Sequence, residues 1–218
     1  MTKLNYKSVP SRSSMDKSMV IFLHGYGANG ADLLSIGDMI SEHLPDTVFL
    51  APDAPDKCNA SPFGFQWFPI PWIDGSSEAD SKFRLEESLE KLSLWIDHCL
   101  LNKNISVAKT CLFGFSQGTM MSLELAPRRT EPFGGVIGFS GRLVSNKISR
   151  KRVKSRCPIL LIHGEQDEVI EPHFLNETVK ELKANEFQVE SFLSPNVGHG
   201  IGPDGLNMAL DFLKRTLY

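Results

Sequence analysis

Short apolar runs alternate along the chain with longer segments of mixed polarity. Six runs have the length of buried strands, and they cover residues 19–23, 48–50, 110–113, 135–139, 159–162 and 189–193. Leucine and isoleucine recur at helical spacing at positions 85, 89, 92, 96 and 100, and leucine again at 206, 210, 213 and 217. This alternation predicts an α/β fold with a mostly parallel central sheet and helices on both of its faces.

Length and composition narrow the class of protein. The 218 residues fit a single α/β domain over residues 1–218, and 41% hydrophobic residues suffice for a sizeable core. A net charge of −3 gives no general attraction to nucleic acid, so we expect no nucleic-acid partner. Residues 1–17 are polar and every apolar run is short, so we expect neither export nor stable membrane insertion. A cytoplasmic location fits best, with the four cysteines as reduced thiols.

A G-x-S-x-G motif at residues 114–118 places Ser116 between an expected strand and a segment suited to a helix. In the α/β-hydrolase fold this motif is the nucleophile elbow, a sharp turn that lifts the serine above the sheet. Gly114 and Gly118 lack the Cβ atoms that would crowd such a turn. Ser140 has glycine nearby but lacks the second glycine of the motif. Ser116 is therefore the candidate nucleophile.

A serine nucleophile requires a base and a carboxylate that fixes the tautomer of that base. In this fold they follow in the order Ser, Asp or Glu, then His, in loops beyond the carboxyl ends of strands. Asp167 lies in such a loop and is the expected acid, although the spacing leaves Glu165 and Glu168 open. His199 follows the last expected strand and is the expected base, since the other histidines occur too early.

The oxyanion formed during acyl transfer needs two backbone N–H donors. One belongs to the residue after the nucleophile, here Gln117, and the other to a loop after an early strand, where we expect Tyr26. His24 in that loop is expected to be a structural hydrogen-bonding residue. No H-x-x-x-H motif or clustered Cys and His spacing occurs, so we expect no metal ion and no cofactor.

A long segment, residues 52–80, interrupts the regular alternation and is rich in Pro, Gly and aromatic residues. Loops of this length in compact proteins are usually functional. Its part 62–72 has too much Pro and Gly for a strand or helix. We expect this part to pack over the active-site face, with Phe65, Trp67 and Phe68 lining a groove for an acyl chain. The alternative is that these rings only fix the loop to the core.

Taken in order, these motifs resemble the phospholipase/carboxylesterase family, which includes acyl-protein thioesterases. The segments that carry the resemblance are residues 24–27, 66–68, 114–118, 163–167 and 198–199. The resemblance implies a broad-specificity carboxylesterase with Ser116, Asp167 and His199 as its triad. It also implies Tyr26 and Gln117 as oxyanion donors. Because Tyr26 and Ala28 stand where eukaryotic thioesterases have Leu and Asp, the chain looks more like the bacterial esterase branch.

We therefore expect a serine carboxylesterase that cleaves short-to-medium acyl esters or thioesters through an acyl-enzyme. Its partner is a small-molecule acyl ester or thioester, and a homodimer is left open. One alternative is a dienelactone-hydrolase relative, which would carry cysteine at the position of Ser116. Another is a noncatalytic binding module that retains the fold. A basic run at residues 147–156 is interpreted as a solvated loop, and the alternative is that it contacts anionic lipid head groups.

Overall fold

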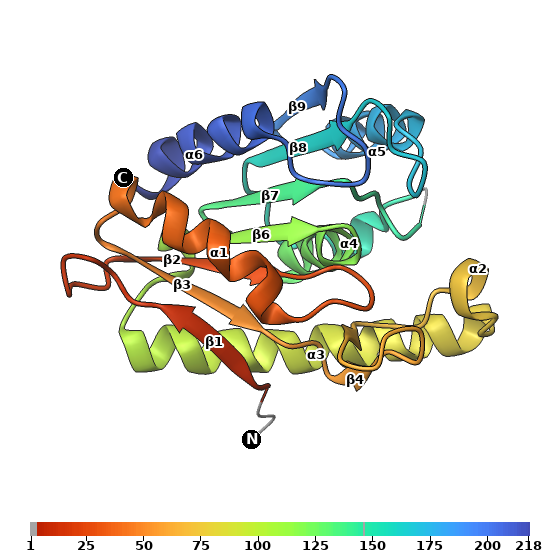
Figure 1. The fold of residues 1–218 in the computed structure, drawn as a ribbon, viewed down its shortest axis with the longest axis horizontal. Helices are drawn as coiled ribbons and strands as arrows, with labels where there is room; N and C mark the ends of the chain where they lie inside the picture. The colour runs from red at the N-terminus through yellow and green to blue at the C-terminus, as the bar shows by residue number, and fades with distance from the viewer. Residues whose placement is uncertain (1–3, 146) are drawn as a thin grey trace.

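The computed structural model describes residues 4–145 and 147–218, so residues 1–3 and 146 of the expected domain lie outside the described residues. Its centre is a seven-stranded sheet with the strand order β1-β3-β2-β6-β7-β8-β9 (Figure 1). All pairs are parallel except that of β1 with β3. The strands are β1 (Tyr6–Val9), β2 (Ser18–Leu23), β3 (Thr47–Pro52), β6 (Thr110–Phe115), β7 (Gly135–Phe139), β8 (Ile159–Gly164) and β9 (Val189–Ser194).

Helices cover both faces of the sheet, as the sequence pattern predicts (Figure 1). Helices α1 (Gly30–Ile40) and α6 (Pro203–Leu217) pack on one face, and α3 (Glu78–Lys103), α4 (Gln117–Leu125) and α5 (His173–Ala184) on the other. Along β2, Val20 and Phe22 join the first of these layers, whereas Met19, Ile21 and Leu23 join the second. Because both faces of this strand are buried, it appears in the sequence as a continuous apolar run.

Helix α3 follows the expected stripe. Its apolar positions Leu85, Leu89, Leu92, Ile96 and Leu100 are all buried. The helix begins after Ser77, whose side chain accepts a hydrogen bond from the backbone N–H of Asp80. It ends at Asn104 in the left-handed conformation, with φ 52°. Short 3-10 helices cover Ser41–His43, Val107–Lys109, Ala126–Arg128 and Arg150–Arg152.

The segment 52–80 is more regular than its composition predicts. It contains the paired strands β4 (Asp56–Lys57) and β5 (Phe65–Gln66) and the helical turn α2 (Pro71–Asp74). Pro71 stands at the first turn of α2, where a missing backbone N–H costs no helical hydrogen bond. The expectation that residues 62–72 form neither strand nor helix is therefore wrong at β5 and at the start of α2.

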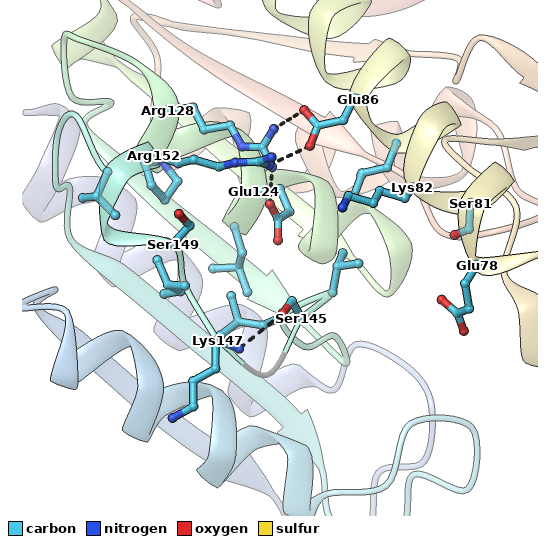
Figure 2. A pocket seen from close by; sticks show the side chains of 17 residues that line it. Glu78, Ser81, Lys82, Glu86, Glu124, Arg128, Ser145, Lys147, Ser149 and Arg152 are labelled. Atoms are coloured by element: carbon cyan, nitrogen blue, oxygen red, sulfur yellow. Dashed lines mark hydrogen bonds and ion pairs between the residues drawn. The ribbon is translucent and has the colours of Figure 1, made fainter.

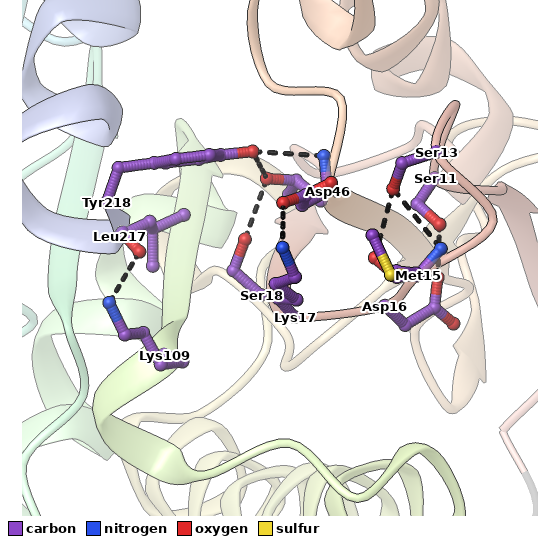
Figure 3. A network of polar contacts seen from close by, with 11 residues as sticks. Ser11, Ser13, Met15, Asp16, Lys17, Ser18, Asp46, Lys109, Leu217 and Tyr218 are labelled. Atoms are coloured by element: carbon purple, nitrogen blue, oxygen red, sulfur yellow. Dashed lines mark hydrogen bonds and ion pairs between the residues drawn. The ribbon is translucent and has the colours of Figure 1, made fainter.

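A polar network joins the carboxyl-terminal residue to the amino-terminal ends of β2 and β3 (Figure 3). The Tyr218 hydroxyl accepts a hydrogen bond from the backbone N–H of Asp46 at 3.1 Å and lies 3.2 Å from the Thr47 hydroxyl. Lys17 pairs with the Asp46 carboxylate, and Lys109 donates to a backbone carbonyl of α6. These contacts close the amino-terminal edge of the sheet and leave the carboxyl edge for the candidate site.

Candidate active site

Ser116 occupies a sharp turn between β6 and α4. Its backbone has φ 53° and ψ −114°, and its N–H donates to the carbonyl of Phe139 in β7 at 2.9 Å. A positive φ at a residue other than glycine costs about 1–3 kcal/mol and persists only where the surroundings enforce it. A Cβ on Gly118 would lie 1.8 Å from the carbonyl oxygen of Leu23, and one on Gly114 would lie 2.5 Å from Gly118. Both motif positions therefore require glycine.

Three side chains from separate loops form one chain of hydrogen bonds. The His199 Nε2 atom is 3.0 Å from the Ser116 hydroxyl oxygen, and its Nδ1 atom is 2.8 Å from the Asp167 carboxylate. Because an ionised carboxylate only accepts, the proton of neutral His199 belongs on Nδ1 and leaves Nε2 as the acceptor for the serine hydroxyl. The loops after β6, β8 and β9 thus bring together the three residues that the sequence pattern selected.

Asp167 is a buried carboxylate with several N–H donors. One carboxylate oxygen accepts from the backbone N–H groups of Val169 and Ile170, each at 2.9 Å. Burial acts to raise the pKa of this carboxyl group, but the donors from Ile170, His199 and Val169 outweigh burial and lower it. Among the described residues, the exposed Glu165 and Glu168 make no hydrogen bond to His199.

The loops that carry Asp167 and His199 are joined through their backbones. The N–H of Glu165 donates to Ser194, and that of Gln166 donates to Val197, both at 2.9 Å. The Phe115 ring lies 5.0 Å from the His199 ring, and 19% of the His199 side chain is exposed. The His199 ring therefore packs near Phe115 and keeps part of its surface exposed to solvent.

The loop after β2 lies beside the elbow, as expected for a second oxyanion donor. It pairs with the backbone of Phe65, which accepts from Gly27 at 2.9 Å and donates to Ala28 at 2.7 Å. Within residues 4–145 and 147–218, the backbone N–H groups of Tyr26 and Gln117 meet no hydrogen-bond acceptor. Two fixed donors are thus available to a ligand in this region.

His24 has the structural role that we expected. Its Nδ1 atom donates to the carbonyl of Gly25 at 2.8 Å, and its Nε2 atom accepts from the N–H of Ala54 at 3.0 Å. Burial lowers the pKa of this imidazole, so it stays neutral. The ring fixes the start of the loop after β2 and lies against Trp67, with ring centroids 5.4 Å apart.

Trp67 and Phe68 do not line a groove. Trp67 has 0% of its surface exposed and Phe68 has 2%, so the prediction that they contact substrate is wrong. The Trp67 indole N–H donates to the carbonyl of His24, and the Gln117 side chain bonds to the backbone of both aromatic residues. These rings connect segment 52–80 to the elbow, whereas Phe65 is half-buried and keeps surface for a ligand.

His163 is a polar residue of the site that sequence reasoning missed. Its side chain is fully buried, and its Nε2 atom lies 2.7 Å from the carbonyl of Ile170 and 3.2 Å from the Asp167 carboxylate. Its position at the carboxyl end of β8, four residues before the acid, is the signal that could have identified it.

A groove of about 500 Å³ runs between α3, α4 and residues 143–145 and 147–153 (Figure 2). Its walls carry an ion-pair network in which Glu86 binds Arg128 and Arg152, and Arg128 also binds Glu124. Part of the basic run at residues 147–156 is therefore paired with acidic side chains. Ser116, Asp167 and His199 are not among the residues that line this groove.

In the described part of the chain, His, Cys, Asp and Glu side chains form no group of three that could bind a metal ion. Over the same residues, no helix combines the length and apolar character needed to span a membrane.

Comparison with known proteins adds sequence and structural relatives. Residues 4–217 match the phospholipase/carboxylesterase family. The protein in the crystal structure of esterase PE8 shares 34% sequence identity with this chain. The match covers 99% of this chain and 100% of the esterase chain, and the two structures superpose with a TM-score of 0.93. Acyl-protein thioesterase 1 homolog 1 of Dictyostelium discoideum is 26% identical over 99% of this chain and 98% of its own length. Esterase YpfH of Escherichia coli K12 is 25% identical in sequence over 96% of this chain and 87% of its own length.

Proposed function

The chain belongs to the phospholipase/carboxylesterase family and is a carboxylic ester hydrolase, and we propose that Ser116, His199 and Asp167 are its catalytic triad. The hydrogen-bond chain from the serine hydroxyl through the imidazole to the buried carboxylate carries this proposal. Geometry of this kind activates a serine hydroxyl for attack on a carbonyl carbon.

In the first half of the reaction, the Ser116 oxygen attacks the carbonyl carbon of the ester or thioester. His199 Nε2 takes the hydroxyl proton, and Asp167 stabilises the imidazolium through Nδ1–H. The backbone N–H groups of Tyr26 and Gln117 bind the oxyanion of the tetrahedral intermediate. When the intermediate collapses, the bond to the leaving group breaks, His199 returns the proton to it, and an acyl-serine ester remains.

In the second half, water replaces the alcohol or thiol. His199 removes a proton from water, the resulting hydroxide attacks the acyl carbon, and Ser116 recovers its proton as it leaves. Part of the His199 side chain is exposed to solvent, which is consistent with this role for water. The products are a carboxylic acid and the free enzyme, so the cycle needs no metal ion or redox partner.

Small-molecule acyl esters and thioesters are the proposed substrates. The relatives include proteins named esterase and acyl-protein thioesterase, which supports cleavage of both ester and thioester bonds. Phe65 is the proposed acyl contact, because its ring is half-buried and its backbone pairs with the oxyanion loop. Each methylene buried against such a surface contributes about 0.8 kcal/mol. The value of kcat/KM should then rise about three- to fourfold per carbon until the surface is covered.

The alternative of a cysteine nucleophile has little support. The elbow carries Ser116, and the described residues of the molecule place all four cysteines in buried positions. Cys111, five residues before Ser116, has its pKa raised by burial to about 12, so its reactive thiolate is scarce.

The test of this function is hydrolysis of p-nitrophenyl esters and one acyl thioester across acyl lengths. We expect the parent enzyme to favour medium chains over acetate and Phe65→Ala to flatten this dependence. Ser116→Ala should lose activity on every substrate by about 10⁴-fold or more. Ser140→Ala is the matched control, since the Ser140 hydroxyl makes one long hydrogen bond within the described residues, at 3.4 Å to the carbonyl of Gly200. Activity that survives in Ser116→Ala would refute the proposed triad.

A further inference from the structure

A second imidazole lies against the triad carboxylate, and the proposed mechanism gives it no role. His163 Nε2 is 2.7 Å from the Ile170 carbonyl and 3.2 Å from the Asp167 oxygen that also faces His199. We propose that His163 is a positioning residue whose single N–H, shared between Ile170 and Asp167, orients the carboxylate and limits its basicity. This inference rests on the proposed function, because it assigns a partner to the acid of the triad.

The hydrogen-bond partners of His163 fix its tautomer. A carbonyl oxygen can only accept, so the short contact with Ile170 places the proton on Nε2. The other ring nitrogen, Nδ1, is buried and has no hydrogen-bond partner among the described residues. A proton on Nδ1 would therefore be buried without an acceptor, which is costly. His163 thus supplies one N–H donor and no positive charge.

Neighbouring groups favour the same neutral state. Burial, the main cause, lowers the pKa of His163, and a positive charge on His199 would lower it further. The contacts with Ile170 and Asp167 act in the opposite direction but do not outweigh burial. When His199 becomes an imidazolium during the reaction, His163 remains a neutral donor to the carboxylate between them.

The three residues also close a small ring that holds the acid loop. Ile170 donates its backbone N–H to one oxygen of Asp167 and accepts at its carbonyl from His163. His163 belongs to β8, which is buried along its whole length, so the ring anchors the loop to a rigid strand. The carboxylate is therefore fixed in the rotation that points its second oxygen at His199.

Loss of the His163 donor has a predictable electrostatic consequence. With one donor fewer, the Asp167 carboxylate becomes a stronger acceptor and stabilises the imidazolium of His199 more. Among the described residues, His199 otherwise makes a hydrogen bond to the Ser116 hydroxyl and a ring contact with Phe115, and neither group carries a charge in the resting enzyme. Glu165 and Glu168, on the same loop as the acid, are exposed to solvent, which screens them. The rising limb of the pH–kcat/KM profile should therefore move to higher pH.

The first experiment compares His163→Phe with His163→Gln. Phenylalanine keeps a buried ring but has no donor, whereas the glutamine amide can place an N–H near the position of Nε2. We expect His163→Phe to lower plateau kcat/KM by about tenfold, since small displacements of orienting groups cost this order. Its pH midpoint should rise by about half a unit or more. His163→Gln should recover the pH midpoint of the parent enzyme, and an unchanged midpoint in folded His163→Phe would overturn the proposal.

A double-variant cycle separates positioning from a general structural role. If His163 acts through the carboxylate, His163→Phe should change kcat/KM little in an Asp167→Asn background. An equal fold-loss in both backgrounds would mean that the residue acts independently of the acid, and would contradict the proposal.

The closing measurement does not depend on turnover. In Ser116→Ala protein, the Asp167–His199 pair can be followed by NMR through the His199 Nδ1–H resonance and the titration of its imidazole. We expect His163→Phe, added to Ser116→Ala, to shift this titration upward and His163→Gln to leave it in place. A titration that neither change moves would overturn the role of His163, even if Ser116 proves to be the nucleophile. If the proposed triad were wrong, the Ser116→Ala single variant would instead retain activity.

Discussion

At the scale of single residues, the assignment of the acid is the most specific claim. Asp167 is buried and touches His199, whereas Glu165 and Glu168 on the same loop are exposed. In Asp167→Asn, the new amide can donate to Nδ1 and so favours the wrong tautomer of the base. We expect kcat to fall by about 10⁴-fold. The Glu165→Gln and Glu168→Gln variants, measured with the same ester, should stay within about twofold of the parent, as usual for exposed sites.

Similar losses in all three variants would show that the loop as a whole, and not the one carboxylate, supports activity. The sequence could select Asp167 because chain order restricts the acid to a loop after a late strand. It could not reveal the contact with His163, since that contact depends on how the loop folds back so that Ile170 faces the same carboxylate.

At the scale of elements, the aromatic segment before α3 is a structural connection to the elbow. Trp67 is fully buried and donates its indole N–H to the carbonyl of His24. Trp67→Ala should therefore lower the free energy of unfolding by about 3–5 kcal/mol, as for other buried aromatic residues. Phe63, in the same segment, is 89% exposed and provides the matched control. Urea unfolding of both variants, followed by circular dichroism, measures this difference.

Phe63→Ala should change the free energy of unfolding by less than about 0.5 kcal/mol. Equal effects at the two positions would contradict the packing described here. The sequence indicated that this segment is too apolar for an ordinary loop, but irregular backbone has no fixed period. Which rings face the core is then decided by tertiary contacts such as those of Gln117.

The regular elements were predictable to different degrees. Five of the six parallel strands, β2, β3, β6, β7 and β8, are buried on both faces and so appear in the sequence as continuous apolar runs. The sixth, β9, is an edge strand that is more exposed and carries Glu190 and Ser191 between its apolar residues. Strand β1 was missed because it is a short edge strand whose residues are mostly exposed. Helix α1 was missed because Gly30 and Gly37 lower its helical propensity, although Gly37 is needed for close packing on Phe49.

At the scale of the whole molecule, two buried neutral histidines make stability depend on pH. Burial lowers the pKa of both His24 and His163. Below about pH 6.5 a histidine in the unfolded chain takes up a proton that the folded protein excludes. Protonation therefore stabilises the unfolded state relative to the folded state. Above this pH the two histidines should not reduce the free energy of unfolding. Below it, the free energy of unfolding should fall by up to about 1.4 kcal/mol per pH unit for each histidine.

Thermal unfolding between pH 7.5 and pH 5 measures this effect, and Tm should decrease steadily below pH 6.5. His163→Gln replaces one of the two titrating groups and should give a smaller decrease. A Tm that is constant or rises over this range would contradict the neutral, buried state of these imidazoles. The carboxyl group of Asp167, whose pKa is lowered, adds a further loss only below about pH 4.

The central claim is that Ser116 is the nucleophile of an acyl-transfer reaction, and a covalent label tests it most directly. A fluorophosphonate reacts with a serine only where a base removes the hydroxyl proton and donors stabilise the developing oxyanion. After brief exposure, intact-mass analysis should show one adduct per chain, and peptide mapping should place it on Ser116. His199→Ala should react far more slowly. Labelling at another residue, or no labelling of folded and active enzyme, would contradict the account.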